Sequence, residues 1–325
     1  MKKQTDHSLD AELSSVADAI AGLADGDKPL SNSDLAELTD LTPEELRLFE
    51  LVWQGMTPER QRKVVSRLVE LAEDNVELNF DAIFRHRLKD DDARVRRQAI
   101  EGLWEDQEAS LIQPFIELMM QDDAVKVREE AATALGRFAM LAEHGKLSAE
   151  QKDRLGQALL ATIDDVDNPV DVRRRALEAA APLSLPRVGQ AIREAYYSDD
   201  HRLKTSAIYA MGRNCDPNWL EVLTSELSSA DAELRYEAAA ACGELGEEEV
   251  VPRLVELTED EDAEVRLVAV QALGKIGGNE AKECLELCLN HPSEAVRQVA
   301  EQALYELETM SEPGSIPWLK FRGEP

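Results

Sequence analysis

Aromatic side chains and long apolar runs are both scarce in this sequence. Aromatics make up only 5% of the 325 residues, which favours thin cores between paired helices over one large globular core. No apolar run approaches the roughly 20 residues of a membrane-spanning helix, and the polar residues 1–7 do not resemble the apolar part of a secretory signal. We therefore expect no membrane segment and a cytoplasmic location.

Basic residues and cysteines are also few. The chain has 36 bases against 66 acids, a net charge of −30, which disfavours direct contact with nucleic acid or anionic lipid. The charge has two readings, namely solubility in general or affinity for a basic protein partner. The four cysteines include no CxxC pair and no nearby histidine cluster, so we predict reduced thiols and no metal site.

A repeated pattern fills most of the chain. Residues 122–136 read DDAVKVREEAATALG and residues 260–274 read DEDAEVRLVAVQALG. Both contain acids, a short turn, Val-Arg, and then Ala and Ala-Leu-Gly at fixed spacing. The basic residue of this pattern, called the anchor below, can be placed seven times. The anchors are Arg96, Arg128, Arg173, Lys204, Arg235, Arg266 and Arg297.

Successive anchors are 32, 45 and then four times 31 residues apart. Each unit is predicted to hold two helices, of which the second begins near the anchor. Apolar residues at offsets +3, +6, +7 and +10 from the anchor share one face of that helix. Glycine recurs at offset +8, which indicates close contact with a neighbouring helix. The acids would cap the second helix, and the anchor would reach an acid of the adjacent repeat.

This pattern resembles HEAT repeats of the short, PBS-lyase-like kind, from about residue 79 to residue 307. The resemblance implies an all-α fold: an α-solenoid, wound as a right-handed superhelix, of about seven helix pairs with a helical N-terminal cap. We expect a mobile acidic segment at 1–30, the cap at 31–78, the repeats at 79–309 and a tail at 310–325. The sequence does not indicate an oligomeric state.

In HEAT-like solenoids the second helices line a concave groove, and their free positions are offsets +1, +2, +5 and +9. Residues 60–220 hold 24 bases and 29 acids, whereas residues 221–312 hold 6 and 23. The groove should therefore pass from mixed or basic to acidic, and exposed Tyr and Arg there suit protein interfaces. The alternative is an ordinary solvated face. The candidate partner-binding residues are Arg97, Arg137, Arg174, Arg175, Tyr209, Arg213, Tyr236, Glu237 and Gln271.

Two further apolar features point to partners. Leu267 and Val268 fall at free positions of the sixth unit, where exposure would favour a protein partner. The tail carries Trp318, Leu319 and Phe321 among prolines. These three residues either fold back on the last helix pair or form a short linear motif for a partner.

Enzyme classes with this architecture make specific demands. A HEAT-like hydroxylase that modifies a lysine-derived residue is expected to hold two irons with repeated His-Glu pairs, but none of the five histidines here precedes Glu. HEAT-like DNA glycosylases need a basic groove. HEAT-like phycobilin lyases share the repeat, which by itself carries no catalytic site. We find no P-loop, HExxH or GxSxG motif. The sequence therefore predicts no enzyme activity, no catalytic residue and no cofactor.

The predicted function is a non-catalytic scaffold or adaptor that binds one or more protein partners, possibly basic ones, along the groove. One alternative is a HEAT-like lyase or chaperone-like factor for a chromophore-bearing protein. Another is regulation of a nucleic-acid machine through its basic protein parts.

Overall fold

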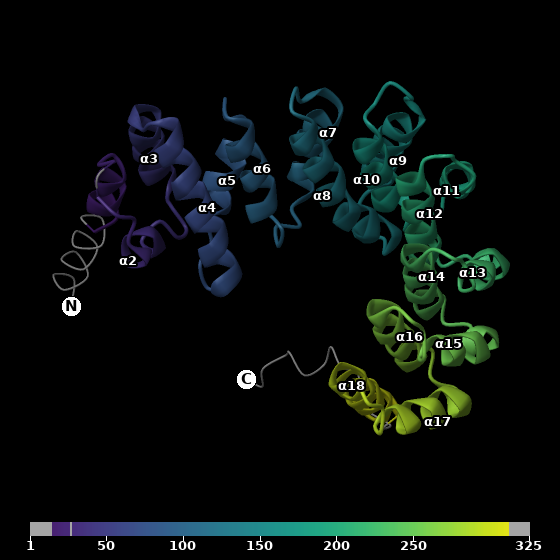
Figure 1. Ribbon diagram of the computed structural model, residues 1–325. Helices are drawn as coiled ribbons and strands as arrows, with labels where there is room; N and C mark the ends of the chain where they lie inside the picture. Colours follow the sequence, from purple (N-terminus) through teal and green to yellow (C-terminus); the bar gives the residue numbers. More distant parts are fainter. Residues whose placement is uncertain (1–14, 27, 312–325) are drawn as a thin grey trace. The chain divides into compact units, whose positions relative to one another are not determined.

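The protein is all-α throughout the residues that its computed structural model describes, 15–26 and 28–311 (Figure 1). It divides into two compact units, Met1–Phe138 and Ala139–Pro325. Unit 1 contains α2 (Asn32–Ala36), α3 (Pro43–Gly55), α4 (Pro58–Asp74), α5 (Asp81–Arg87), α6 (Ala93–Gly102), η1 (Ala109–Leu111), α7 (Ile112–Gln121) and the first part of α8 (Val125–Glu143). Unit 2 contains the end of α8 and α9 (Ala149–Asp164), α10 (Val170–Ala180), α11 (Pro186–Tyr196), α12 (His201–Asn214), η2 (Pro217–Trp219), α13 (Leu220–Glu226), α14 (Ala232–Leu245), η3 (Glu248–Val250), α15 (Val251–Leu257), α16 (Ala263–Ile276), α17 (Gly278–Cys288) and α18 (Glu294–Ser311).

Helix pairs form the repeat, and each of the seven anchors lies near the start of a second helix, from α6 to α18. The expectation of an α-solenoid of about seven pairs is therefore confirmed. The one long interval between anchors has a structural cause. The extra residues lengthen α8 and α9 and form the turn between them, and the boundary between the two units falls inside α8.

The N-terminal cap begins each of its longer helices with a signal that the sequence displays. Thr42 and Glu45 form a capping box at α3, in which each side chain accepts the other residue's backbone N–H. Thr57 caps α4 by accepting the backbone N–H of Arg60. The apolar face of α4 includes Val64 and Leu68, both fully buried. The cap thus covers the core of the first repeat.

Part of the segment expected to be mobile packs on this cap. Residues 15–23 are helical, and Ile20 and Leu23 are buried. The Arg60 side chain donates hydrogen bonds to the carbonyl oxygens of Leu23 and Lys28. These contacts fasten the segment to α4. Residues 1–14 and 312–325 lie outside the described residues.

Small residues bring the second helices of unit 2 close together. A Cβ added to Gly212 of α12 would lie 2.6 Å from Cα of Ala241 in α14. One added to Gly243 of α14 would lie 2.9 Å from Cα of Ala272 in α16. The contact that the recurring glycine indicates is therefore confirmed. Because backbone meets backbone, these positions leave no room for a methyl group.

Phenylalanines fill the core of unit 1 instead. Phe49, Phe80, Phe84, Phe115 and Phe138 are all fully buried there, and the rings of Phe80 and Phe84 meet edge to face with centroids 6.3 Å apart. The five include every phenylalanine of the described residues. The core of unit 1 therefore contains phenylalanine rings, whereas the described core of unit 2 contains none.

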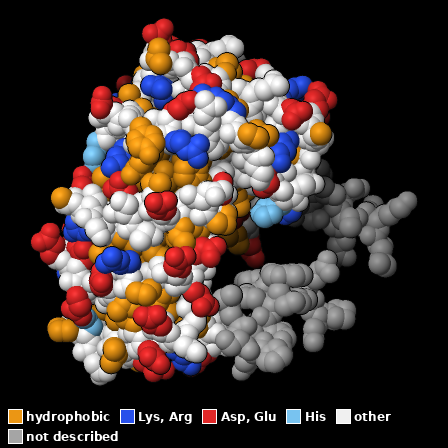
Figure 2. Space-filling model, turned by 90° about the vertical axis from the view of Figure 1, so that its right-hand side faces the viewer, with side chains coloured by type: hydrophobic (Ala, Val, Ile, Leu, Met, Phe, Trp, Pro, Cys, Tyr) orange, Lys and Arg blue, Asp and Glu red, His pale blue; other side chains and the backbone are white. Residues whose placement is uncertain are grey.

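The surface of unit 2 on the side of its first helices is mixed. Figure 2 shows hydrophobic side chains in short patches separated by acidic ones on the side that carries α13, α15 and α17. All four cysteines are free thiols, and three of them are buried. Among the described helices, none combines the length and the apolar character that crossing a bilayer requires.

Candidate functional site: the second-helix faces

Four of the second helices begin with a capping aspartate. Asp92, Asp200, Asp231 and Asp262 cap α6, α12, α14 and α16, and each accepts the backbone N–H of the residue two positions later. This hydrogen bond satisfies one of the free donors of the first turn. The capping role that the sequence predicts for the acidic turn is confirmed at these four helices.

Three of the seven anchors tie neighbouring repeats together. Arg96 donates to both carboxylate oxygens of Asp122 at 2.7 Å, and Arg235 donates to those of Asp260 at 2.8 Å. Lys204, the exception to arginine, pairs with Glu226 of the next repeat at 2.8 Å. These three ion pairs are largely buried. The contact with an acid of the adjacent repeat is therefore confirmed for three anchors, whereas the other four donate to backbone carbonyl oxygens of their own repeat: Arg128, Arg173, Arg266 and Arg297.

The regular stacking leaves one face of the second helices exposed in unit 2. We call the exposed and half-buried side chains of α10, α12, α14 and α16 at offsets +1, +2, +5 and +9 the unit 2 face. Six predicted residues belong to it: Arg174, Arg175, Tyr209, Arg213, Tyr236 and Glu237. Gln271 of α16 belongs to it as well and is exposed.

The arginines of the unit 2 face are already paired. Arg175 lies 2.6 Å from the Glu178 carboxylate, and Arg174 contacts both Asp171 and Glu178. Arg213 lies 3.7 Å from Glu244. The basic run that the sequence shows at residues 173–175 is therefore neutralised within the protein, which leaves the tyrosines as the more available contacts.

The centre of the unit 2 face is acidic. Burial, then the charges of Glu178 and Glu233, raises the pKa of Glu237 to about 7. Burial likewise raises the pKa of Tyr209, and the acids at Glu178, Glu237 and Glu244 add to the effect. Tyr209 is 42% exposed and Tyr236 is 36% exposed. An acidic face with two accessible rings suits a partner that brings a positive charge.

Unit 1 holds the two remaining predicted residues, in different settings. Arg97 of α6 is exposed, and its nearest carboxylates, Glu101 and Glu130, are both 3.9 Å away. Arg137 is largely buried, because its guanidinium lies over the rings of Phe115 and Phe138 at 5.4 and 4.9 Å. Burial lowers the pKa of Arg137 to about 10. Arg137 thus serves the core of unit 1 more than its surface.

Other apolar candidates are placed differently from expectation. Val268 is buried, with 5% exposure, and Leu267 is only half-exposed. Both residues belong to the packing of α16 and do not form an exposed apolar patch, so that expectation is wrong. The tail residues Trp318, Leu319 and Phe321 lie outside the described residues.

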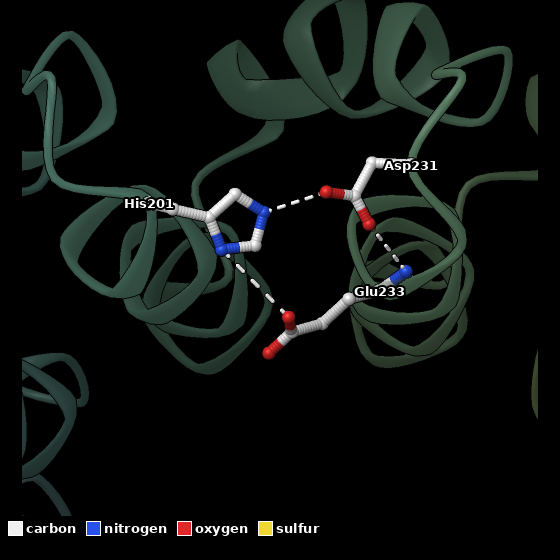
Figure 3. Close-up of side chains that lie close together, drawn as sticks. All are labelled: His201, Asp231 and Glu233. Atoms are coloured by element: carbon white, nitrogen blue, oxygen red, sulfur yellow. Dashed lines mark hydrogen bonds and ion pairs between the residues drawn. The ribbon is translucent and has the colours of Figure 1, made fainter.

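A histidine and two carboxylates meet at the edge of unit 2. His201, at the start of α12, lies between Asp231 and Glu233, at the start of α14, and turns one ring nitrogen toward each (Figure 3). Nε2 is 2.7 Å from Oδ2 of Asp231, and Nδ1 is 3.7 Å from Oε2 of Glu233. The hydrogen bond with His201 lowers the pKa of Asp231.

This cluster, the only one of its kind in the described part of the chain, fits an ion pair better than a metal centre. Two ligands held 2.0–2.1 Å from a tetrahedral ion are about 3.3 Å apart, which exceeds the Nε2–Oδ2 distance. Asp231 already caps α14. Arg62 pairs in the same way with the capping Asp92 in unit 1, at 2.5 Å. The cluster therefore resembles a tie between repeats, and it does not supply ligands for two irons.

The fold and its faces define a class of protein: an α-solenoid of short helix pairs with free positions on its second helices. A family model described as HEAT repeats matches residues 82–167 and 220–305, more than half of the chain. The chain belongs to the HEAT-repeat family.

Two curated relatives are similar to part of the chain. The deoxyhypusine hydroxylase of Drosophila pseudoobscura pseudoobscura is 33% identical over 112 residues, which cover 34% of this chain and 36% of that protein. The Drosophila melanogaster enzyme is 30% identical over 102 residues, 31% of this chain and 34% of its own. The chain thus spans about a third of the length of the curated relatives it matches.

Among solved structures, the complex of CpcE and CpcF of phycocyanin lyase from Nostoc sp. PCC7120 is similar to this chain. The TM-score is 0.51 and the identity 17%, with 86% of this chain and 98% of that one covered. At this identity the likeness shows the fold alone. A lyase or chaperone-like role for a chromophore protein therefore stays a prediction.

The hydroxylase relatives correct one expectation from the sequence. The prediction that the chain is not an enzyme is wrong as stated, because both curated relatives are enzymes. That prediction relied on missing motifs, such as a glutamate after a histidine. The absence of such motifs does not exclude an enzymatic function when about a third of the chain aligns with known enzymes.

Proposed function

We propose that this HEAT-repeat protein binds a protein partner on the unit 2 face. The observation that carries the proposal is the pair of exposed tyrosines, Tyr209 and Tyr236, on the adjacent helices α12 and α14 beside the half-buried carboxyl of Glu237. Tyrosine supplies a large contact area at low cost in conformational entropy and is enriched in binding hot spots.

The charge of the surroundings favours a partner with a basic segment. The charge of Glu178 lies close enough to Glu237 to contribute to the raised pKa of Glu237. Glu178 is already paired with Arg174 and Arg175. A lysine or arginine of the partner placed beside Glu237 would therefore pair with Glu237 and hold it in its ionised form. Binding should then strengthen as the pH rises through about 7, because more Glu237 is charged before the partner arrives.

Affinity purification with matched tyrosine variants tests this proposal. Tyr209→Ala with Tyr236→Ala removes both rings of the unit 2 face, whereas Tyr197→Ala removes a ring at the end of the first helix α11, where it is 73% exposed. We expect a partner that wild type and Tyr197→Ala capture equally and that the double variant captures at least about tenfold less. Equal capture by all three proteins would contradict the proposal.

An enzyme activity is the second candidate, and the similarity to the deoxyhypusine hydroxylases favours it. The test is to incubate the iron-supplemented protein with a deoxyhypusine-bearing substrate protein and to follow hydroxylation by mass spectrometry. Formation of the hydroxylated product would establish the activity. Absence of product would reject this candidate and would leave the binding proposal to its own test.

A further inference from the structure

A cavity of about 490 Å³ crosses the second helices of unit 1 near their N-terminal ends. Its walls come from α4, α6 and the start of α8. Five bases line it, and none of its lining residues is acidic, in a protein with a net charge of −30. The five are Arg62, Lys63, Arg94, Arg97 and Lys126.

The positive charge of this cavity is only partly balanced. Arg62 pairs with Asp92 at 2.5 Å and Lys126 pairs with Glu129 at 2.8 Å. Arg97 has only the long contacts of 3.9 Å described above. Within the residues that the structure describes, neither Lys63 nor Arg94 has a side-chain ion pair. Lys63 and Arg94 therefore carry two positive charges that no ion pair within the described residues balances. An anion from outside the protein would balance them.

A second cavity of about 440 Å³ continues the first. The two share Lys63 and Ser66, and the second adds Lys28, Arg60 and Arg67 without any acid among its lining residues. Arg60 is buried, and its guanidinium donates to backbone carbonyl oxygens instead of a carboxylate. Lys28 and Arg67 pair with Asp34 and Glu70, so the second cavity adds length to the basic surface more than unbalanced charge. The elongated surface suits an extended chain better than a single small ion.

We propose that this basic groove of unit 1 binds a phosphorylated segment of a protein. A phosphoserine or phosphothreonine carries close to two negative charges and three acceptor oxygens. These match the charge that Lys63 and Arg94 leave unbalanced, and a guanidinium can hold two phosphate oxygens at once. The sequence interpretation singled out Arg97 as a groove residue, and the structure places it in this cavity.

Nucleic acid is the poorer occupant because of its size. Charges in solution are screened beyond about 8 Å at physiological ionic strength, so a short phosphorylated segment interacts mainly with the groove itself. A longer polyanion would also approach the acidic surface of the rest of the chain, which repels it. The inference concerns unit 1 only and does not rest on the proposed function of unit 2.

The test uses a fluorescein-labelled peptide of glycine, alanine and serine with two phosphoserines, and the same peptide without phosphate. Binding to the full-length protein is followed by fluorescence anisotropy. The site variant is Lys63→Glu with Arg94→Glu, both at exposed positions. The matched control is Arg253→Glu with Lys282→Glu, which makes the same charge change on the exposed first helices of unit 2. Lys63→Gln with Arg94→Gln serves if the reversed charges prevent folding.

We expect saturable binding of the phosphorylated peptide, with an affinity at least about tenfold lower in the site variant and within about twofold of wild type in the control. The unphosphorylated peptide should bind at least about tenfold more weakly than the phosphorylated one. No binding of the phosphopeptide, or equal loss in both variants, would overturn the proposal. Tighter site-dependent binding of a single-stranded DNA oligonucleotide with the same number of phosphates would overturn it in favour of nucleic acid.

Discussion

Units 1 and 2 build the same helix pairs with different core residues. Unit 1 buries five phenylalanines, and a Cβ on Gly102 of α6 would lie 2.5 Å from the ring of Phe84. In unit 2, Gly212 and Gly243 face alanines of the next second helix. Rings fill volume, whereas glycine and alanine remove it. The comparison shows that the same helix-pair repeat accepts a core rich in phenylalanine in one unit and a core without phenylalanine in the described part of the other.

The exposed faces of the two units differ as well. The groove of unit 1 is lined by five bases, of which Lys63 and Arg94 have no ion pair among the described residues. The unit 2 face pairs its arginines internally and presents tyrosines beside carboxyl groups, such as Glu237. One chain thus offers surfaces of opposite character, which the average charge of −30 conceals.

The strongest test of the core comparison is Phe84→Ala. Removing this fully buried ring should destabilise unit 1 by about 3–5 kcal/mol, because a cavity remains where the ring was. Hydrogen exchange should rise sharply in α5 and α6 and stay unchanged in α14 and α16. Phe84→Leu, which keeps most of the volume, is the control and should cost less. Equal loss of protection in both units would show that they do not unfold separately.

The next largest effect concerns the anchors. Asp260→Ala removes the carboxylate from Arg235, whose side chain is only 8% exposed, so we expect a loss of about 3 kcal/mol in the free energy of unfolding by urea. Glu44→Ala breaks a pair with Arg47 in which both side chains are at least 70% exposed, and it should cost about 0.5 kcal/mol or less. Similar losses would mean that burial does not govern these pairs.

The same anchor pair gives a pH dependence. Burial by itself would raise the pKa of Asp260, but the hydrogen bonds from Arg235 and from the Asp262 backbone outweigh it and lower that pKa. The stabilisation is therefore complete above the unfolded-state pKa of about 4 and is lost as the pH falls through the lower folded-state value. The Asp260→Ala variant lacks this contribution, so its free energy of unfolding should fall less than that of wild type as the pH falls through this range.

Two glycines of unit 2 test the close approach of its helices. Gly243→Ala places a Cβ 2.9 Å from backbone of α16, and we expect a loss of about 2 kcal/mol. Gly189→Ala in α11 meets nothing within 4 Å and should raise stability by about 0.5–1 kcal/mol through helix propensity. Thermal unfolding measures both. Shifts of the same sign in the two variants would contradict the packing of unit 2.

The smallest expected effect is that of Glu237→Gln. Because the folded-state pKa of Glu237 is about 7, above that of the unfolded chain, unit 2 loses stability as the pH rises from about 4.5 to 7. The amide should remove this slope and add about 1–2 kcal/mol at pH 8, after allowance for solvent screening. If the free energy of unfolding by urea changes between pH 5 and 8 as steeply in Glu237→Gln as in wild type, the Glu237 carboxyl is solvated and its pKa is not raised.

Much of the fold follows from periodicity. The anchor spacing, the capping aspartates and the glycine at offset +8 predict the second helices of unit 2, because each feature is local or repeats at a fixed interval. The aromatic core of unit 1 does not follow, since Phe84 and Phe115 contribute to a volume that only the packed helices define. Val268 shows the same limit, because its offset predicts exposure while α16 buries it.

The candidate faces were predictable in outline only. Offsets identify Tyr209 and Arg97 as free positions, but they cannot show that Arg174 and Arg175 are paired with acids or that Arg137 lies over two rings. Lys63 could have been found, because it stands in the basic run 60–63 at the start of α4. Its convergence with Arg94 depends on the stacking of α4 on α6.

The central claim is that the second helices, and not the first, meet the partner. Site-specific photo-cross-linking tests it most directly, with a photoreactive amino acid at position 209 on α12 or at position 197 after α11. We expect position 209 to cross-link to a protein in the native host and position 197 not to cross-link to that protein. Cross-linking of the same protein from position 197 alone would contradict binding of the partner by the second helices.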